Sequence, residues 1–172
     1  MDGGSYLFGS RSLLGLGVAV LAAIADQTAK LWLIFVYDLP RRGLVALTPF
    51  LDLILTWNQG ISYGLFPQET AFGRWLLLAI KAGAVVVLWV WLARVRAKLS
   101  AVALGLIIGG AIGNAVDRLT YGAVADYLLF RLDTAGGRFN WYVFNLADAA
   151  IVAGVIGLLY ESFRPDRAVK AP

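Results

Sequence analysis

The chain has 172 residues, of which 60% are hydrophobic and only 15% are charged, and its net charge is +4. Soluble domains are nearer half apolar and about a quarter charged, so this balance favours an integral membrane protein. The chain contains neither Cys nor His, which excludes a Ser–His–Asp triad, a cysteine nucleophile and a Cys/His zinc site. Acid–base chemistry would therefore depend on carboxylates, Lys or Tyr.

Four apolar blocks predict four transmembrane helices, over residues 12–37, 72–93, 100–118 and 142–162. A helix needs about 20 residues to cross the hydrocarbon core, so the third block must include its flanks. The segment from Arg11 to Ala25 also has the features of a cleavable signal peptide, but the apolar run resumes after Lys30 and favours a retained helix. We expect a mainly α membrane protein that forms one domain over residues 1–172.

Basic residues lie mainly at the ends of the apolar blocks, which is typical of anchoring at a membrane surface and not of nucleic-acid binding. The side with both termini carries more of them than the other side does. Its members are Arg11, Arg94, Arg96, Lys98, Arg164, Arg167 and Lys170, against Arg41, Arg42, Arg131 and Arg138. The positive-inside rule therefore predicts that both termini are cytoplasmic and that loops 38–70 and 119–141 are outside.

The two outer loops differ in their expected structure. Residues 44–47 and 51–57 are short β-prone runs bounded by Gly, Pro and Asn, and they predict a small sheet on the membrane surface. The loop 119–141 contains three glycines, and we expect it to contribute to a loop or helix lid. The aromatic residues at the outer span ends, Trp75, Trp141 and Tyr142, fit an aromatic belt.

Small residues recur every four positions in the last two predicted spans, where they would let helices approach closely. They are Gly105, Gly109 and Gly113 in the third span, and Ala149, Ala153 and Gly157 in the fourth.

Polar residues form three clusters at the outer ends of the predicted spans, where a charge is costly unless it is paired. The clusters are Asp26 with Lys30, then Asn114, Asp117, Arg118 and Asp126, then Asn145 with Asp148. Each has a purely structural explanation. Asp26 and Lys30 can neutralise each other as an i,i+4 pair, and Asp117 and Arg118 can do so at a helix end. Asp126 can be an ordinary loop carboxylate, which its own segment favours. Asp148 can be a helix N-terminal acid that interacts favourably with the helix dipole.

The clusters also have a joint chemical interpretation. Because the third span ends outside and the fourth begins outside, Asp126 and Asp148 can meet at the outer interface. Two close carboxylates share one proton, and such a pair can activate water against a peptide bond. The alternatives are a proton- or ion-coupled transporter and a non-enzymatic lipid-binding protein. A transporter predicts polar residues throughout the membrane depth and an internal repeat, and the sequence shows neither.

Four stretches carry a family resemblance and follow one another in that family's order. They are Asp26-Gln27 with Lys30, residues 58–64, residues 109–118 with Gly122, Val124 and Asp126, and residues 144–148. On these residues the chain resembles the bacterial lipoprotein signal peptidases, also called signal peptidase II. The resemblance implies an inner-membrane aspartic endopeptidase with four helices. It would cleave diacylglyceryl-modified prolipoproteins before the lipidated cysteine.

The resemblance also assigns residues and partners. It implies catalysis by Asp126 and Asp148, with no metal or cofactor. Supporting or substrate-binding roles fall to Asp26, Lys30, Asn58, Gly60, Asn114, Asp117, Arg118 and Asn145. We expect a monomer that contacts membrane lipids, the prolipoprotein and globomycin-type inhibitors. Two departures stand out: Tyr63 and Tyr127 replace a more usual Phe, and the stretch 131–140 is longer than expected.

Overall fold

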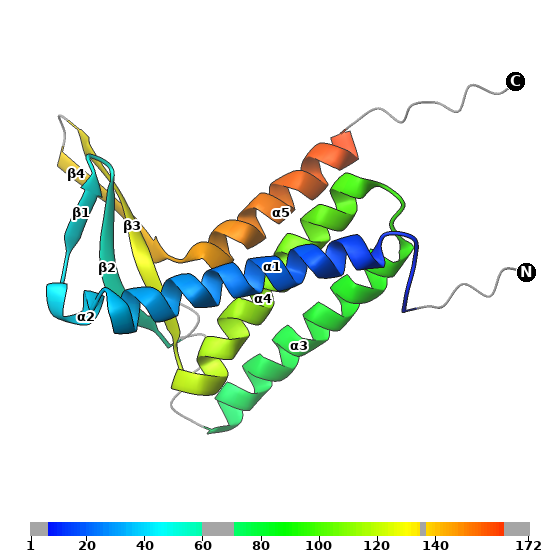
Figure 1. Ribbon diagram of the computed structural model, residues 1–172, viewed down its shortest axis with the longest axis horizontal. Helices are drawn as coiled ribbons and strands as arrows, with labels where there is room; N and C mark the ends of the chain where they lie inside the picture. The colour runs from blue at the N-terminus through cyan, green and yellow to red at the C-terminus, as the bar shows by residue number, and fades with distance from the viewer. Residues whose placement is uncertain (1–6, 60–70, 135–136, 164–172) are drawn as a thin grey trace, which may run out of the picture.

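The computed structural model of the chain describes residues 7–59, 71–134 and 137–163. Long helices form a bundle in these residues, and a small sheet projects from one end of it (Figure 1). The helices are α1 (Ser12–Leu31), which continues into the π-helical turn η1 (Trp32–Val36), then α3 (Ala71–Arg94), α4 (Lys98–Tyr121) and α5 (Leu146–Phe163). The start of α1 and the end of α5 lie at the bundle end away from the sheet (Figure 1).

Each of the four apolar blocks of the sequence lies largely within one long helix. Within the described residues, three segments are long and apolar enough to cross a membrane, namely Ser12–Val36, Lys98–Tyr121 and Leu146–Phe163. The backbone of α3 has 24 helical residues, and its described apolar stretch is the shorter Ala82–Arg94. The predicted start of the fourth span at residue 142 is wrong, because Tyr142 to Phe144 end a strand and the helix begins at Leu146.

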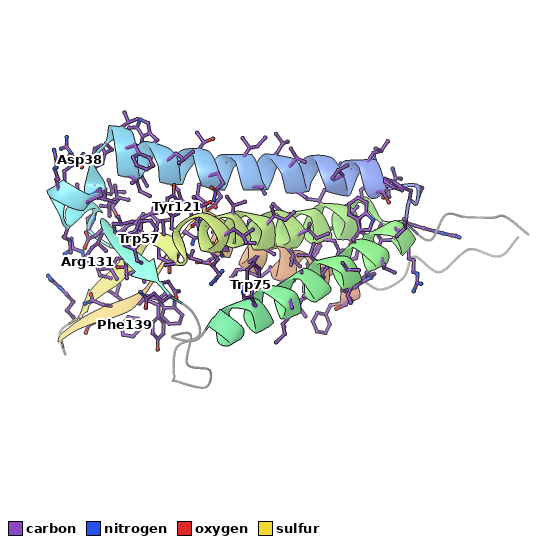
Figure 2. The ribbon with its side chains drawn as sticks, turned by 90° about the horizontal axis from the view of Figure 1, so that it is seen from below. Asp38, Trp57, Trp75, Tyr121, Arg131 and Phe139 are labelled. Atoms are coloured by element: carbon purple, nitrogen blue, oxygen red, sulfur yellow. The ribbon has the colours of Figure 1, made fainter. Side chains whose placement is uncertain are left out.

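The sheet has four antiparallel strands in the order β1-β2-β3-β4. The strands β1 (Val45–Thr48) and β2 (Leu51–Asn58) confirm the two predicted runs. The expectation of a loop or helix lid over 119–141 is wrong for most of that segment. It forms a hairpin of β3 (Val124–Thr134) and β4 (Gly137–Phe144) instead, whose aromatic and branched side chains favour a pleated surface. Figure 2 shows Arg131 and Phe139 on this hairpin, with Trp57 of β2 beside Tyr121 at the end of α4.

Helix α4 lies between α1 and α5 (Figure 1), and glycines bring its backbone against both neighbours. A Cβ at Gly109 would lie 2.4 Å from the carbonyl oxygen of Ala19, and one at Gly110 would lie 2.4 Å from that of Ala147. Both distances are too short for a real side chain, so the close contact requires glycine. The small-residue prediction for α4 is thereby confirmed.

The corresponding prediction for α5 is largely wrong. Ala149 and Ala153 are exposed, although Gly157 does face Ala103 of α4. The closest approach is made by Gly154, where a Cβ would lie 2.5 Å from the carbonyl oxygen of Ala103. The contact face of α5 is thus rotated by one residue from the predicted stripe.

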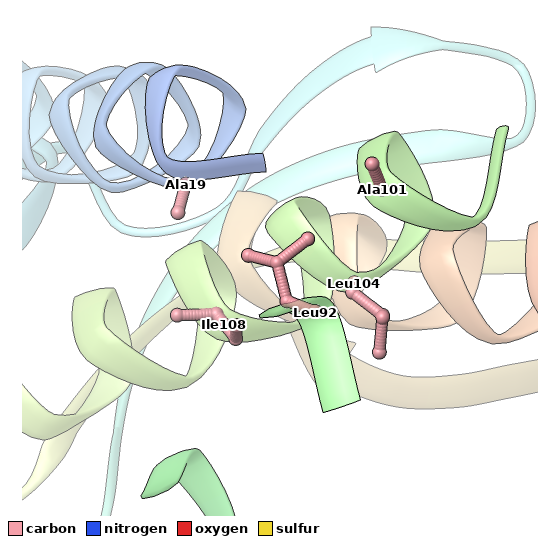
Figure 3. Packing of buried hydrophobic residues seen from close by; sticks show 5 residues of the cluster. All are labelled: Ala19, Leu92, Ala101, Leu104 and Ile108. Carbon is pink, nitrogen blue, oxygen red and sulfur yellow. The ribbon is translucent and has the colours of Figure 1, made fainter. Parts of the chain in front are cut away.

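Among the described side chains of helix α3, Leu92 is the buried one at the contact with the bundle, and Val85, Leu88 and Trp89 pack around it. Leu92 is fully buried and packs with Ala19 of α1 and with Ala101, Leu104 and Ile108 of α4 (Figure 3). Gly15 of α1 leaves the space for it, because a Cβ there would lie 2.5 Å from a methyl carbon of Leu92.

A second apolar cluster fixes the sheet to the end of α1. Leu33 of η1, Leu39 of the short helix α2 (Leu39–Arg42), Leu53 of β2 and Tyr127 of β3 are all buried in it. At the end of α4, Gly122 has a φ of +75°, a left-handed conformation that glycine adopts without strain. The chain can therefore turn from α4 into β3 within two residues.

Candidate active site

The two predicted catalytic aspartates lie where the sheet meets the bundle. Asp126 lies in β3 opposite Thr56 of β2, and it is 3% exposed. Asp148 lies in the first turn of α5 and is half-buried. Strand β4 leads directly into α5, so the hairpin brings both carboxylates to the same end of the bundle.

A pair of asparagine amides connects the two aspartates. Asn145 Nδ2 donates to Asp126 Oδ1 at 2.6 Å and to Asn114 Oδ1 at 3.1 Å. Asn114 Nδ2 in turn donates to Asp148 Oδ1 at 2.8 Å. Asn145 is fully buried and Asn114 is 9% exposed. Because buried amides are held by the bonds they make, this Asn145–Asn114 pair orients both carboxylates.

The second oxygen of Asp126 accepts a bond from β2. Asn58 Nδ2 donates to Asp126 Oδ2 at 3.0 Å. Burial raises the pKa of Asp126 above its ordinary value of 3.8, and the charge of Asp148 raises it further, while the hydrogen bonds from Asn58 and Asn145 lower it. The net direction is upward, as in a carboxyl pair that shares one proton.

Asn145 and Asp148 cap the start of α5 through two reciprocal hydrogen bonds. Asp148 N donates to Asn145 Oδ1 at 3.0 Å, and Asn145 N donates to Asp148 Oδ2 at 3.2 Å, which is the geometry of a capping box. Leu146 N donates to Tyr127 Oη at 3.3 Å, and burial raises the pKa of that hydroxyl, so it stays protonated. No pattern in the sequence predicts this contact of Tyr127, which joins β3 to the start of α5.

A buried ionic network joins α1 and α4 close to the aspartates. Lys30 Nζ lies 2.7 Å from Asp26 Oδ2 and 2.8 Å from Asp117 Oδ2, and it donates to Asn114 Oδ1 at 3.2 Å. The predicted Asp26–Lys30 pair is therefore confirmed. The direct ion pair of Asp117 is with Lys30 and not with Arg118, although the charge of Asp117 also interacts with that of Arg118.

The two acids of this network also hold the backbone around the site. Asp26 Oδ1 accepts a bond from Ala147 N of α5 at 3.0 Å, and Asp117 Oδ2 accepts one from Ala125 N of β3 at 3.0 Å. The network thus ties the residue before each candidate catalytic aspartate to α1 or α4. A buried charge at membrane depth is stabilised only by such pairing and hydrogen bonding.

Gln27 belongs to the network as well, although the predicted site residues did not include it. Its Nε2 lies within 2.8 Å of Asp117 Oδ1, 3.0 Å of the carbonyl oxygen of Gly113 and 3.3 Å of Asp26 Oδ2. Gln27 is part of the Asp26-Gln27 stretch that carries the family resemblance, and this was its signal in the sequence.

Arg118 is half-buried on the side of α4 that faces the aspartates. Its Nη1 donates to the carbonyl oxygen of Asn114 at 3.1 Å, and its charge interacts with Asp126 and Asp148. Its Nε is buried, and among the described residues it has no hydrogen-bond partner. Gly60, another predicted site residue, lies outside the described residues.

Comparison with known proteins identifies the family. Residues 18–164 match the family described as signal peptidase (SPase) II. The chain belongs to the signal peptidase II family. The family fits the catalytic chemistry available to a chain without Cys or His, and it makes this chain a protease that processes lipoproteins. The transporter alternative receives no support.

Similar signal peptidases cover nearly the whole chain. The lipoprotein signal peptidase of Nitrobacter hamburgensis is 60% identical over 158 residues, which cover 92% of this chain and 96% of that protein. The lipoprotein signal peptidase of Rhodopseudomonas palustris strain TIE-1 is 55% identical over 159 residues, with coverage of 92% and 97%. The family and the apolar helices indicate the bacterial inner membrane.

A solved structure shares the fold. It is described as a bacterial membrane enzyme determined by the in meso method at 1.9 Å resolution. Its TM-score is 0.66 at 24% identity, and the match covers 88% of this chain and 93% of that chain. The arrangement of bundle and sheet is therefore one that a membrane enzyme adopts.

Proposed function

We propose that the chain is an aspartic endopeptidase that cleaves diacylglyceryl-modified prolipoproteins immediately before the lipidated cysteine, with Asp126 and Asp148 as the catalytic pair. The observation that carries this proposal is the pair of carboxylates held together through Asn145 and Asn114. The family supports the substrate, and the raised pKa of Asp126 supports the shared proton.

The catalytic step needs one charged and one protonated carboxyl. The charged one removes a proton from water, which attacks the scissile carbonyl carbon, while the protonated one polarises the carbonyl oxygen. The tetrahedral intermediate then collapses, and the leaving amine receives a proton from the pair. No covalent enzyme intermediate is formed.

The supporting residues act through position and charge in this proposal. Asn58, Asn114 and Asn145 orient the carboxylates. The network of Asp26, Lys30 and Asp117 fixes β3 and α5 relative to each other. The guanidinium of Arg118 places a positive charge beside the two carboxylates, and the resemblance assigns Gly60 a supporting or substrate-binding role.

All four long helices cross the membrane in this proposal, with both termini cytoplasmic and the sheet outside. The aspartates and the sheet lie at the same end of the bundle, and Arg94, Arg96 and Lys98 lie between α3 and α4 at the other end (Figure 1). The positive-inside rule favours this orientation. The exposed Trp75 at the start of α3 and Trp141 on β4 fit an outer aromatic belt.

An active site at this depth suits a lipid-modified substrate. Acyl chains that stay in the bilayer contribute roughly 0.8 kcal/mol per buried CH₂. This binding energy can hold the scissile bond at the carboxylates even where the peptide offers few contacts.

The decisive measurement is cleavage of a diacylglyceryl-modified prolipoprotein by the purified protein in detergent. Asp126→Asn and Asp148→Asn should each abolish cleavage while the proteins stay folded, because each variant loses one protonatable group. Asp38→Asn is the matched control, since Asp38 is partly exposed and pairs with Arg41 away from the site. Wild-type turnover by either dyad variant would remove that residue from the mechanism.

A second measurement tests the inhibitor expected from the resemblance. Globomycin should raise the thermal unfolding temperature by mass action, since it would bind only the folded site. No shift at saturating concentration would count against the site as proposed.

A further inference from the structure

Two largely apolar grooves lie side by side on α3, and neither Asp126 nor Asp148 lines them. The first has a volume of about 530 Å³ and runs between α1, α3 and α4. Every residue that lines it is apolar, including Leu16 and Ile24 of α1 and Ile112 of α4. Leu16 and Ile24 are eight residues apart, so the groove extends about 12 Å along α1.

The second groove shares a wall with the first. It has a volume of about 360 Å³ and is lined by Val86, Val87, Val90, Trp91 and Arg94 of α3. Val86 and Val90 also line the first groove, so these two side chains form a ridge between the two grooves. One groove on each side of this ridge offers a place for each of the two chains of a diacyl lipid.

The positively charged side chain of Arg94 lies at the α4 end of α3, beside the second groove. Arg94 lines the second groove and lies one helical turn beyond Val90. Arg94 is exposed, and among the described residues no carboxylate lies within ion-pair distance of it. The exposed Arg96 and Lys98 follow within four residues, so the local charge is positive.

The N-terminal segment brings one more cation to this end. Trp89 Nε1 donates to the carbonyl oxygen of Leu7 at 3.0 Å, and Leu7 lines the first groove. Arg11 Nε donates to the carbonyl oxygen of Arg96 at 3.1 Å. The segment from Leu7 to Arg11 therefore runs along the last turns of α3 and brings Arg11 beside the basic link.

We propose that the two grooves bind one anionic diacyl phospholipid, with one acyl chain on each side of the Val86–Val90 ridge and the phosphate at Arg94. Charge selects the ligand, because basic side chains at a membrane surface attract anionic headgroups. The grooves bury part of the acyl chains against apolar side chains. Both volumes fall within the range of about 300–1,000 Å³ usual for ligand sites.

This lipid site is separate from the proposed substrate site. Asp126 and Asp148 lie at the sheet end of the bundle, whereas Arg94 lies at the α3–α4 link at the opposite end (Figure 1). On the proposed orientation the phosphate belongs to the cytoplasmic leaflet, while the substrate headgroup belongs to the outer one. Only this leaflet assignment rests on the proposed function, because the grooves and Arg94 are features of the fold.

Tryptophan fluorescence provides the test, because Trp89 lines the first groove and Trp91 lines the second. Phosphatidylglycerol with brominated acyl chains is titrated into the full-length protein in detergent, beside brominated phosphatidylcholine. We expect saturable quenching at lower concentration for phosphatidylglycerol. Trp89→Phe and Trp91→Phe should each remove part of the quenching. A quenching amplitude that neither substitution lowers, or that only one of the two lowers, would overturn the two-groove arrangement.

Variants test the charge and the ridge separately. Arg94→Gln should weaken phosphatidylglycerol binding about fivefold and leave phosphatidylcholine binding unchanged, whereas Arg41→Gln at the sheet end should change neither. Val86→Phe should narrow both grooves and weaken both lipids. Val86 is 62% exposed, so the larger side chain is compatible with folding. Val155→Phe is its control, because Val155 is an exposed residue of α5 that lines neither groove.

Two outcomes would overturn the proposal. One is equal affinity for the two lipids together with no effect of Arg94→Gln. The other is a change in oligomer mass, but not in lipid binding, when Val86 is replaced, which would assign this face to a second copy of the chain. Prolipoprotein cleavage is measured on the same samples. Intact cleavage with absent lipid selectivity would refute the lipid site alone and leave the protease proposal standing.

Discussion

Asn145 and Asp148 exchange two hydrogen bonds at the start of α5, from Asp148 N to Asn145 Oδ1 at 3.0 Å and from Asn145 N to Asp148 Oδ2 at 3.2 Å. The same asparagine donates from Nδ2 to Asp126 Oδ1 at 2.6 Å. One side chain therefore caps the helix with its oxygen and holds the opposite carboxylate with its nitrogen. The two roles use different atoms, so substitution can separate them.

Asn145→Ser should keep the cap and lose the contact with Asp126. A serine hydroxyl caps a helix about as well as an asparagine, but it cannot reach Asp126 and Asn114 as the amide does. We expect kcat to fall about 100-fold, as for a small misplacement of a catalytic group, with a smaller loss of thermal stability than in Asn145→Ala. Steady-state cleavage and thermal unfolding in detergent measure the two effects.

Asn145→Ala is the comparison for this prediction, because it removes both the cap and the amide. It should lower the free energy of unfolding by about 1 kcal/mol more than Asn145→Ser does. Equal stability of the two variants would mean that the cap contributes nothing. Wild-type kcat in Asn145→Ser would mean that the amide does not position Asp126.

Lys30→Met should strongly destabilise the protein. It leaves Asp26 and Asp117 buried without their cation, and breaking a buried ion pair in this way costs about 3–5 kcal/mol. Arg41→Gln breaks the exposed pair with Asp38, whose side chains are 88% and 44% exposed, and such pairs contribute about 0–1 kcal/mol. Thermal unfolding of both variants in detergent makes the comparison, and similar losses would show that the Lys30 network adds no stability.

Of the two ion pairs of Lys30, the sequence predicts the one with Asp26 and not the one with Asp117. Asp26 and Lys30 are four residues apart, and helical geometry alone places them together. The ion pair of Asp117 with Lys30 joins two helices that are far apart in the chain, so no local pattern predicts it. The same limit applies to the bond from Ala147 N to Asp26, which depends on how α5 packs on α1.

The β3–β4 hairpin and the start of α5 differ from the hydropathy-based predictions, although each has a local signal in the sequence. Gly136-Gly137 separates two runs rich in branched and aromatic residues, which is a hairpin pattern, yet the segment was expected to form a lid. Asn145 and Asp148 have capping-box spacing, which marks the helix start, yet apolar content extended the predicted span back to residue 142. In both cases the turn and cap residues predict the observed structure better than hydropathy does.

Gly113→Ala should destabilise the protein by about 1–3 kcal/mol. A Cβ at this position would lie 2.6 Å from Asp26 Oδ2, so the carboxylate would have to move away from Lys30. Gly83→Ala is the matched control in α3, because nothing lies within 4 Å of its Cβ position. It should stabilise the helix by about 0.5–1 kcal/mol through lost backbone entropy of the unfolded chain. Thermal unfolding should therefore shift in opposite directions, and a shared direction would contradict the packing at Gly113.

Asp126→Asn should change the pH dependence of stability, because the pKa of Asp126 is raised above 3.8 on folding. Below pH 3.8 the folded and unfolded chains both hold this proton, so it has no effect on stability. As the pH rises above 3.8 the unfolded chain releases the proton first, and the wild type loses stability until the pH passes the raised pKa. The amide that replaces the carboxyl does not titrate, so the variant avoids this loss.

The variant should therefore gain stability relative to the wild type as the pH rises above 3.8, and the gain should level off once the pH passes the raised pKa of Asp126. Asn58 is exposed and can turn its amide oxygen towards the new NH₂, so the substitution does not leave an unpaired donor. Thermal unfolding in detergent across this range measures the difference, with Asp38→Asn as the exposed control. A difference that is constant with pH would mean that Asp126 has the same pKa in both states. A difference that shrinks with rising pH would mean that folding stabilises its charge, and the pair would not share a proton in the way that catalysis requires.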